Sequence, residues 1–351
     1  MKKKKRKSIL IPFFILTLLV VAGVSIYIYI SEADTRKLKS IGYDTGEITF
    51  IKEHKIPIDL LSKYKYISKL TEIVNNKSYK DDLLEKYLEV YKDGDDINTI
   101  IYMVNNNITY PYSEKLVSLI GSKYFILKNL DRYMSYEESN IDLTIQMVNC
   151  NRDYEYYTNT VKTDTTKGLL MLVNKYYYLD PEYVYGDLVE ISSEYSNNSG
   201  SKLNSEAYEA FKELVNDSEK ENLHIRNNYA YRTYSYQEGV YNNYKNKSGP
   251  IYADSISARP GFSEHQTGLS LDVGVATRYA DDKFQNTKEY LWMKDNSYKY
   301  GFILRYPEGK EDITGYNFEA WHYRYVGKEA AKFIYDNDLT LEEYYAYYVD
   351  K

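Results

Sequence analysis

Two stretches of this 351-residue chain combine histidine and carboxylate residues at spacings that suit metal chemistry. The first reads SEHQTGLSLD and contains His265 and Asp272, and the second reads EAWHYR and contains Glu319 and His322. Two imidazoles and one carboxylate form a ligand set that suits catalytic zinc and leaves a fourth position for water. Glu319 would then be the general base for that water. These residues predict a metal-dependent site.

Ordinary histidines are the competing interpretation. The ligand set is spread widely along the chain and matches no strict motif, so its spacing alone leaves a metal site and two ordinary histidines as alternatives. His54 and His224 have no acidic or histidine partner at ligand spacing, and we take them as ordinary. The single cysteine, Cys150, excludes an internal disulfide framework and a thiolate zinc cluster, because both need several sulfurs.

The candidate ligands need particular local structure to meet at one ion. Gly268 permits a sharp turn between His265 and Asp272. The alternation of leucine with polar residues that ends at Asp272 predicts a half-buried strand whose carboxylate points away from the leucines. Glu319 and His322 would point to opposite faces of a regular strand. A bend, a bulge or a helical turn must therefore lie between them.

Other segments predict the scaffold around these residues. The dense apolar run from Leu169 to Leu179 predicts a strand. Ser205 precedes apolar residues at helical spacing through Leu214, which predicts an amphipathic helix with a serine cap. Strand and helix signals mixed with many loops indicate an α+β domain.

The N-terminus predicts a membrane anchor. Basic residues Lys2 to Lys7 precede an uncharged, mostly apolar run from Ser8 to Ile30. As a helix this run spans about 35 Å, and the hydrocarbon core of a bilayer needs roughly 30 Å. Acidic residues follow it, so we expect the N-terminus in the cytoplasm and the rest outside. A cleaved signal peptide is the alternative, although its apolar region is usually shorter, at about 7–15 residues.

Charge argues against a nucleic-acid partner. The chain has 45 Lys and Arg against 51 Asp and Glu, for a net charge of -6, and the basic residues of positions 2–7 belong to the tail. The remainder is therefore more acidic than the whole, whereas phosphate binding draws on a basic surface. A hydrophobic fraction of 43% excludes a wholly disordered chain.

The region before the chemical motifs contains a suspected repeat. The segment from Leu84 to Asn105 resembles the segment from Leu130 to Asn149, each with a tyrosine near its start and Met-Val-Asn at its end. A period in the forties suits stacked pairs of helices. Coincidence in a chain rich in Tyr, Asn and Ile is the alternative. A polar stretch at 158–167 marks a linker.

The pattern Ser-x-His-x6-Asp, followed by Glu-x-Trp-His, resembles the zinc D,D-carboxypeptidases of the VanY type, peptidase family M15B. The likeness covers about residues 169–345. It implies the α+β fold shared with the hedgehog signalling domain, a small antiparallel sheet flanked by helices. The other segments that match in order are LVNK (172–175), YRTYSYQ (231–237), SARPG (257–261), YGFILRYP (300–307) and WHYRYVG (321–327).

The resemblance also assigns roles. It implies that His265, Asp272 and His322 are the zinc ligands, that Glu319 is the catalytic base and that Arg232 stabilises the carbonyl oxygen as it becomes anionic. Tyr229 stands where the family usually has a small residue, so the substrate rim is expected to differ. Positions that resemble the family's substrate contacts are Gln237, Ser257, Arg259 and Ser263.

From these observations we expect a membrane-anchored, extracellular zinc carboxypeptidase that removes the C-terminal D-Ala from peptidoglycan stem peptides. The alternatives are an L,D-carboxypeptidase on tetrapeptide stems, a non-catalytic zinc-containing wall-binding module and an interaction scaffold built on the helical region. Glu319 argues against a module without turnover, which needs no base. The expected domains are a cytoplasmic basic tail (1–7), a transmembrane anchor (8–30), a helical spacer or repeat region (31–165) and the zinc carboxypeptidase domain (166–351).

Overall fold

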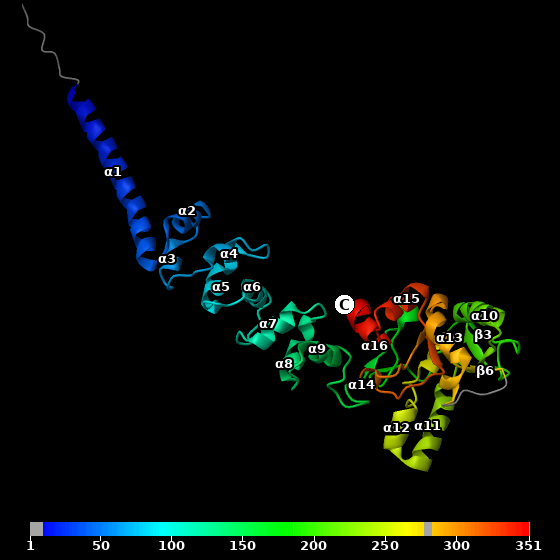
Figure 1. Ribbon diagram of the computed structural model, residues 1–351. Coiled ribbons are helices and arrows are strands. Elements are labelled where there is room, and N and C mark those ends of the chain that lie inside the picture. The colour runs from blue at the N-terminus through cyan, green and yellow to red at the C-terminus, as the bar shows by residue number, and fades with distance from the viewer. Residues whose placement is uncertain (1–9, 185, 277–282, 351) are drawn as a thin grey trace, which may run out of the picture. The chain divides into compact units, whose positions relative to one another are not determined.

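The computed structural model describes residues 10–184, 186–276 and 283–350 (Figure 1). Two compact units divide the chain, Met1–Gly121 and Ser122–Lys351. The division falls earlier than the expected one at residues 165 and 166. Residues 122–165 belong to the second unit because they contact its C-terminal end: the Tyr124 ring stacks on Tyr347 with centroids 3.9 Å apart, and Gln146 donates to Glu343 at 2.7 Å.

The first unit is built from helices around an apolar core. Aspartates begin two of its helices, since the Asp44 side chain accepts from the Glu47 N–H and the Asp96 side chain accepts from the Thr99 N–H. Ile, Leu and Tyr side chains from several helices share one buried cluster. The helices are α1 (Leu10–Ile41), α2 (Thr45–Glu53), α3 (Ile58–Leu61), α4 (Leu70–Val74), α5 (Leu84–Val90), α6 (Ile97–Asn105) and α7 (Glu114–Gly121), with a 3-10 turn at Asp81–Leu83.

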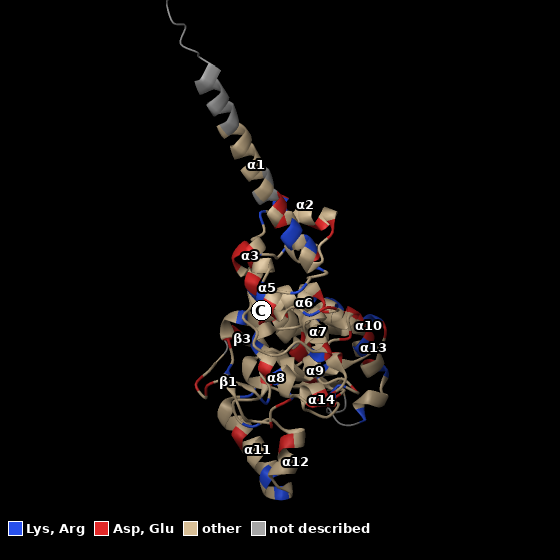
Figure 2. Cartoon of the chain, turned by 90° about the vertical axis from the view of Figure 1, so that its left-hand side faces the viewer, with Lys and Arg blue, Asp and Glu red and all other residues tan. Residues whose placement is uncertain are grey.

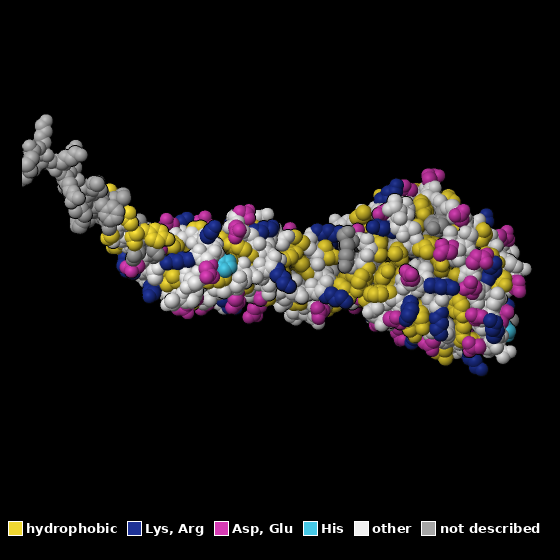
Figure 3. Space-filling model, turned by 90° about the horizontal axis from the view of Figure 1, so that it is seen from above, with side chains coloured by type: hydrophobic (Ala, Val, Ile, Leu, Met, Phe, Trp, Pro, Cys, Tyr) yellow, Lys and Arg dark blue, Asp and Glu magenta, His cyan; other side chains and the backbone are white. Residues whose placement is uncertain are grey.

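Helix α1 contains most of the predicted anchor. Its described apolar side chains between Leu19 and Tyr29 are exposed, and Figure 3 shows them as a yellow group beside grey atoms. Charged residues follow from Glu32, so the described apolar stretch is short. Within the described residues, no helix has the length and apolar character needed to cross a bilayer. The anchor expected over Ser8–Ile30 is therefore not supported, and residues 1–9 lie outside the described part of the chain.

The two suspected repeat segments have the same local structure. In each, a 3-10 turn leads into a short helix, a connector follows, and a second helix ends at the shared asparagine. Tyr87 donates to the Asn105 side chain at 2.7 Å, and Tyr133 donates in the same way to Asn149. This recurring buried tyrosine–asparagine pair favours a repeat over coincidence.

The second unit contains a four-stranded antiparallel sheet, the largest among the described residues, with strand order β5-β6-β8-β7. One face carries Leu271 and Tyr323 and packs on Phe211 and Leu214 of α10, which lies in the same apolar cluster. The other face is available for the site, because neighbouring residues on a strand point to opposite sides. The small antiparallel sheet flanked by helices agrees with the expected α+β domain.

Two local predictions for this unit need correction. Leu169–Leu179 is not one strand: a 3-10 segment ends at Leu170, and only Tyr177–Tyr178 pairs, because the apolar run is buried by packing rather than by a ladder. The cap of α10 is Asn204, whose side chain accepts from two N–H groups of the first turn, and not Ser205.

The remaining elements complete the second unit. In Figure 1, α11 and α12 form a hairpin beside the sheet. The helices are α8 (Leu130–Ser135), α9 (Ile141–Asn149), α10 (Ser205–Lys220), α11 (Tyr234–Ser248), α12 (Pro250–Ile256), α13 (Lys288–Asn296), α14 (Glu311–Thr314), α15 (Lys328–Asp336) and α16 (Leu341–Tyr344), and the strands are β1 (Val161–Lys162), β2 (Tyr177–Tyr178), β3 (Leu188–Glu190), β4 (Lys202–Asn204), β5 (Ile225–Tyr229), β6 (Ser270–Val275), β7 (Phe302–Leu304) and β8 (His322–Tyr325).

Charged residues of both signs are interspersed on these elements. Figure 2 shows both blue and red segments on the helices of each unit.

Gly268 allows a direct test of the turn that precedes β6. Its φ of +68° is left-handed, and an added Cβ would lie 2.6 Å from a Leu188 methyl carbon. We expect Gly268→Ala to lower the free energy of unfolding of the second unit by about 1–2 kcal/mol. Urea denaturation followed by tryptophan fluorescence measures this, because Trp292 and Trp321 both lie in this unit.

Gly239→Ala is the matched control. Gly239 lies inside α11, and an added Cβ meets nothing within 4 Å. Alanine is favoured over glycine in a helix by about 1 kcal/mol, so this variant should be as stable as the original chain or more stable. Equal stability of the two variants would contradict the requirement for a left-handed residue at Gly268.

Candidate active site

Strand register brings Asp272 and His322 together. The two residues are directly opposite each other in the antiparallel pair β6-β8, and His322 Nδ1 lies 3.0 Å from an Asp272 carboxylate oxygen. Their neighbours Leu271 and Tyr323 are also paired and point into the core. The predicted strand with its carboxylate turned away from the leucines is confirmed, but it is buried on both faces and is not half-buried.

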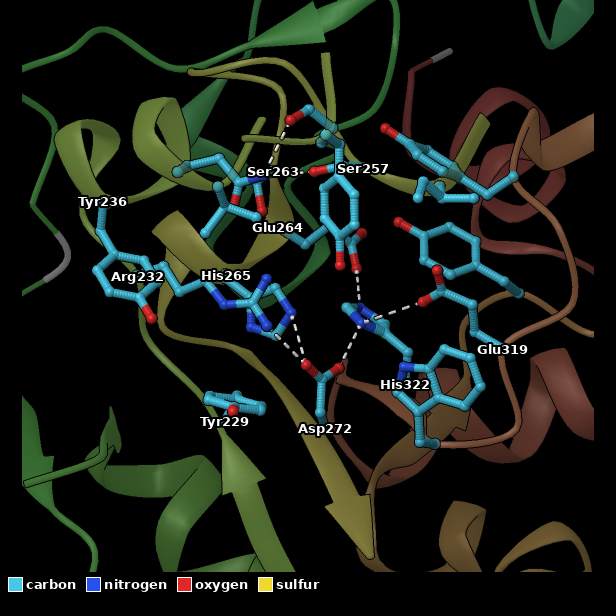
Figure 4. A pocket seen from close by; sticks show the side chains of 18 residues that line it. Tyr229, Arg232, Tyr236, Ser257, Ser263, Glu264, His265, Asp272, Glu319 and His322 are labelled. Carbon is cyan, nitrogen blue, oxygen red and sulfur yellow. Dashed lines mark hydrogen bonds and ion pairs between the residues drawn. The ribbon is translucent and has the colours of Figure 1, made fainter. Parts of the chain in front are cut away.

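His265 reaches the same place from a 3-10 turn, Glu264–Thr267, that ends at the left-handed Gly268. Its Nδ1 lies 2.7 Å from the Ala230 carbonyl, to which it donates. This donation leaves the lone pair of Nε2 free to bind a metal ion. Nε2 faces the Asp272 carboxylate at 3.5 Å (Figure 4).

These three side chains fit a metal ion. One potential ligand atom from each of His265, Asp272 and His322 lies within 4.8 Å of the others, and all three residues are buried. Two imidazole nitrogens and a carboxylate oxygen are the donors that zinc takes in catalytic sites, and they leave a position for water or substrate. The donor set therefore fits zinc.

Glu319 lies at the edge of this cluster. The His322 N–H donates to the Glu319 carbonyl at 3.2 Å, so a turn, and not a regular strand, separates the two residues. The turn that the sequence required is thus present. It brings a Glu319 carboxylate oxygen to 3.8 Å from His322 Nδ1. Burial raises the pKa of Glu319 to about 7, and the Asp272 charge adds to this while His322 opposes it.

The pKa values of the three candidate ligands are shifted in different directions. Burial would raise the pKa of Asp272, but the two histidines and Arg232 hold it well below its usual value. Burial and the charge of Arg232 lower the pKa of His265 to about 4. Burial also opposes protonation of His322, yet its interactions with Asp272 and Glu264 raise its pKa to about 9.

Arg232 lies beside the ligands, just before α11. Its Nη2 donates to the Asp272 carboxylate at 2.8 Å, and its N–H donates to the His265 carbonyl at 3.1 Å. Its buried Nε has no hydrogen-bond partner among the described residues. That Nε is a donor available to a bound substrate.

The four residues that resemble substrate contacts separate into two groups. Gln237, Ser257 and Ser263 line the cavity, and Gln237 donates to the Ser257 hydroxyl at 3.2 Å. Arg259 is not brought to the cavity: both ends of its guanidinium donate to Asp254, at 3.0 and 2.8 Å, and the group lies 4.0 Å above the ring of Tyr157.

The cavity has a volume of about 400 Å³ and an aromatic lining that sequence reasoning did not assign to it. Tyr236, Val240 and Tyr244 follow one face of α11, since they are four residues apart. Helical spacing alone could not place these three residues in the site, because it does not show that the helix flanks the cavity. Tyr229, which the sequence placed at the substrate rim, also lines the cavity, and the other unassigned lining residues are Ile256, Ala258, Glu264, Tyr306, Tyr316 and Trp321.

Glu264 is the most consequential of these residues. Its side chain is fully buried and accepts from Arg305 Nε at 2.7 Å and from Arg324 Nη1 at 2.9 Å. Burial would raise the pKa of Glu264, but the two arginines hold it well below its usual value. Two features of the sequence could have indicated Glu264. It is next to His265, and Arg305 and Arg324 lie in two of the segments that match the family.

Comparison with known proteins identifies relatives of this second unit. The family model for VanY, D-alanyl-D-alanine carboxypeptidase, matches residues 200–328. A putative carboxypeptidase YodJ from Bacillus subtilis is 40% identical over 202 residues, which are 54% of this chain and 74% of that protein. A D-alanyl-D-alanine carboxypeptidase from Enterococcus faecium is 36% identical over 52% of this chain and 58% of its own length.

A solved structure extends the similarity to the fold. The LdcB LD-carboxypeptidase is 39% identical, with a TM-score of 0.51, and the match covers 54% of this chain and 91% of that one. The structure of LdcB was described as revealing the molecular basis of peptidoglycan recognition.

The protonation of the site predicts proton release on zinc binding. At pH 7.5 the metal-free His322 is protonated, since its pKa is about 9, whereas His265 is neutral, since its pKa is about 4. Zinc binds both imidazoles in their neutral form, so His322 must lose one proton when zinc binds. Zinc binding to a Glu319→Gln chain should therefore release about one proton. Calorimetric titration in two buffers of different ionisation enthalpy measures this number. The glutamine removes Glu319 as a second source of protons.

The same titration at pH 10 is the control. Above the pKa of His322 the ring is already neutral, and the zinc-bound water, whose pKa zinc lowers, remains as the source of any proton released. A release near zero at pH 7.5 would show that His322 is not the protonated member of the metal-free cluster.

Proposed function

Because the chain belongs to the VanY family of D-alanyl-D-alanine carboxypeptidases, we propose that it is a zinc carboxypeptidase that removes the C-terminal D-Ala from peptidoglycan stem peptides. The observation that carries the proposal is the position of Glu319 beside the cluster of His265, Asp272 and His322. A base next to a metal ligand set is the arrangement of a hydrolase.

The proposed chemistry divides between the metal and the side chains. Zinc, when bound to His265, Asp272 and His322, supplies Lewis acidity that polarises a carbonyl and lowers the pKa of a water molecule. Glu319 takes a proton from the attacking water and returns it to the amine of the departing D-Ala. A pKa raised toward neutrality suits both steps, because the carboxyl can accept and donate at working pH.

Other residues orient the substrate in this proposal. Arg232 Nε, which has no described partner, donates to the carbonyl oxygen as negative charge develops on it. Gln237, Ser257 and Ser263 line the same cavity and offer polar groups to the terminal carboxylate of the peptide. Arg259 remains an expected substrate contact from sequence, although Asp254 holds it in this structure.

An L,D-carboxypeptidase acting on tetrapeptide stems is the second candidate. The observation that favours it is the 39% identity and shared fold with LdcB, which is an LD-carboxypeptidase. The two substrates differ at one stereocentre and by one residue in length. The residues that line the cavity do not favour one of these substrates over the other. A wall-binding module without turnover is disfavoured, because Glu319 would have no role there.

The proposed substrate also bears on location and organisation. Peptidoglycan is a polymer of the cell wall, so we propose that the second unit works outside the cytoplasm. Residues 166–351 hold all of the proposed chemistry, and we propose them as the catalytic part. The residues that precede them, 31–165, would act as a spacer or a binding arm, whose last part, 122–165, packs on the catalytic part.

Turnover of defined peptides tests the reaction. The zinc-loaded full chain should release one D-Ala from a pentapeptide stem that ends in D-Ala-D-Ala, as followed by mass spectrometry. Glu319→Gln should reduce kcat by about 10²–10⁴-fold, since it removes proton transfer. Zinc affinity should change little, because Glu319 is not among the three ligands.

Three other outcomes have defined meanings. Release from a tetrapeptide stem alone would establish the L,D alternative. Absence of D-Ala release from both peptides, with zinc bound, would reject the enzyme and favour the wall-binding module. Undiminished release by the Glu319→Gln chain would show that another group is the base.

Tyr229 allows a separate test of the substrate rim. Its ring is 39% exposed at the cavity mouth and lies 5.5 Å from the Arg232 guanidinium. Tyr229→Ser restores the small residue usual in the family and removes an exposed ring at the rim. Covering about 20–40 Å² of that ring with substrate is worth about 0.5–1 kcal/mol. We expect KM to rise about 2–5-fold, which is this energy expressed as a ratio, with kcat within about twofold.

Tyr252→Ser is the control for Tyr229→Ser. Tyr252 is also exposed but lies on α12 and does not line the cavity. Its substitution should leave both kinetic constants unchanged. An unaltered KM for Tyr229→Ser would mean that the substrate does not contact this rim.

A further inference from the structure

We propose that Glu264 is a positioning residue, which orients the metal ligand His322 by accepting the hydrogen bond of its Nε2–H. We further propose that Arg305 and Arg324 hold Glu264 in place for this role. The inference rests on the metal site of the proposed function. It adds a residue that acts on the metal site through a ligand, and that is not a ligand itself.

The two nitrogens of His322 face different groups. Nδ1 faces Asp272 at 3.0 Å and Glu319 at 3.8 Å, on the side of the metal cluster. Nε2 faces the other way, toward Glu264 Oε2 at 3.5 Å (Figure 4). Nδ1 is therefore the nitrogen that can bind a metal shared with His265 and Asp272, and Nε2 then carries the proton.

Neither atom of the proposed contact has another partner. His322 Nε2 and Glu264 Oε2 are both buried, and among the described residues neither makes a hydrogen bond, although they face each other at 3.5 Å. Leaving a buried donor and a buried acceptor unpaired costs about 1–3 kcal/mol each. Pairing them with each other removes both costs. A metal-bound histidine generally donates its second N–H to a carboxylate or a carbonyl group in this way.

The arginines determine which oxygen of Glu264 is available. Arg305 Nε and Arg324 Nη1 both donate to Oε1, so Oε2 alone points at His322. Arg324 is fixed in turn by the carbonyls of Leu169 and Met171, at 2.9 and 2.8 Å. The carboxylate therefore cannot rotate without breaking two charged hydrogen bonds.

Burial of this charge cluster argues for a role beyond stability. Arg305, Arg324 and Glu264 have fully buried side chains. Moving such charges out of water costs several kcal/mol per ion, and a packed apolar set of equal volume is often as stable or more stable. A carboxylate held next to a metal ligand gives this arrangement a use that apolar residues could not supply.

Glu342 offers a matched comparison within the same cluster. It is buried like Glu264, and it accepts from both terminal nitrogens of Arg305, at 2.8 and 2.6 Å. Among the described residues, Glu342 makes no hydrogen bond or ion pair with His322. Replacing either glutamate by glutamine removes one buried negative charge. In Glu264→Gln the two arginines require the one amide oxygen, so the NH2 group, which cannot accept, is turned toward the metal ligand.

The test compares zinc affinity in the full chain, measured by competition with a chromophoric chelator. We expect Glu264→Gln to weaken zinc binding about 10–100-fold, the usual effect of removing such a partner. Glu342→Gln should stay within about threefold of the original chain, by the same reasoning. Thermal unfolding of the metal-free proteins serves as the second readout, and both variants should unfold at lower temperature.

Equal weakening by the two variants would overturn the proposal, since it would trace the effect to loss of charge in the fold. Unchanged zinc affinity in Glu264→Gln would also overturn it. If Glu264→Gln does not fold, Glu264→Asp replaces it, because the shorter side chain keeps the charge and withdraws the acceptor from Nε2. It should weaken zinc binding to a similar degree.

Failure of the proposed function gives a different result. Zinc affinity is measured without substrate, so a chain that releases no D-Ala can still show the difference between Glu264→Gln and Glu342→Gln. That outcome would reject the carboxypeptidase and leave Glu264 as a positioning residue of a zinc site.

Discussion

The register between β6 and β8 is the constraint on which the site depends. It sets Asp272 opposite His322 on one face of the sheet and Leu271 opposite Tyr323 on the other. A slip of one residue in β6 would send the carboxylate into the core and a leucine toward the metal cluster. Because the apolar face packs on α10, the hydrophobic core that stabilises the second unit also aligns two of the three metal ligands.

Burial of the opposite face imposes a second constraint, which is electrostatic. His322 lies between the carboxylates of Asp272 and Glu264, and each carboxylate is in turn paired with arginine, Arg232 for the first and Arg305 for the second. Charges of opposite sign therefore alternate through the interior. The alternation keeps Asp272 ionised, as a metal ligand must be, although burial alone would favour its neutral form.

The sequence anticipated the parts of the site that depend on local spacing, and it missed the parts that depend on packing. His265 and Asp272 are seven residues apart around one glycine, and the turn between Glu319 and His322 followed from strand geometry. The partners of Glu264 come from positions about 40 and 60 residues away, which no local pattern reveals. The run from Leu169 failed as a strand for the same reason, because packing decides whether an apolar segment pairs.

The division of the chain also follows from these buried contacts. The second repeat segment belongs to the peptidase unit because Gln146 of α9 reaches Glu343 of α16. The neighbouring Glu342 accepts from Arg305, which in turn donates to Glu264 beside the metal ligand His322. Helix α16 thus contributes one face to the repeat segment and one to the charge cluster. A boundary at the polar stretch 158–167 would cut through this arrangement, whereas one at Gly121 leaves it whole.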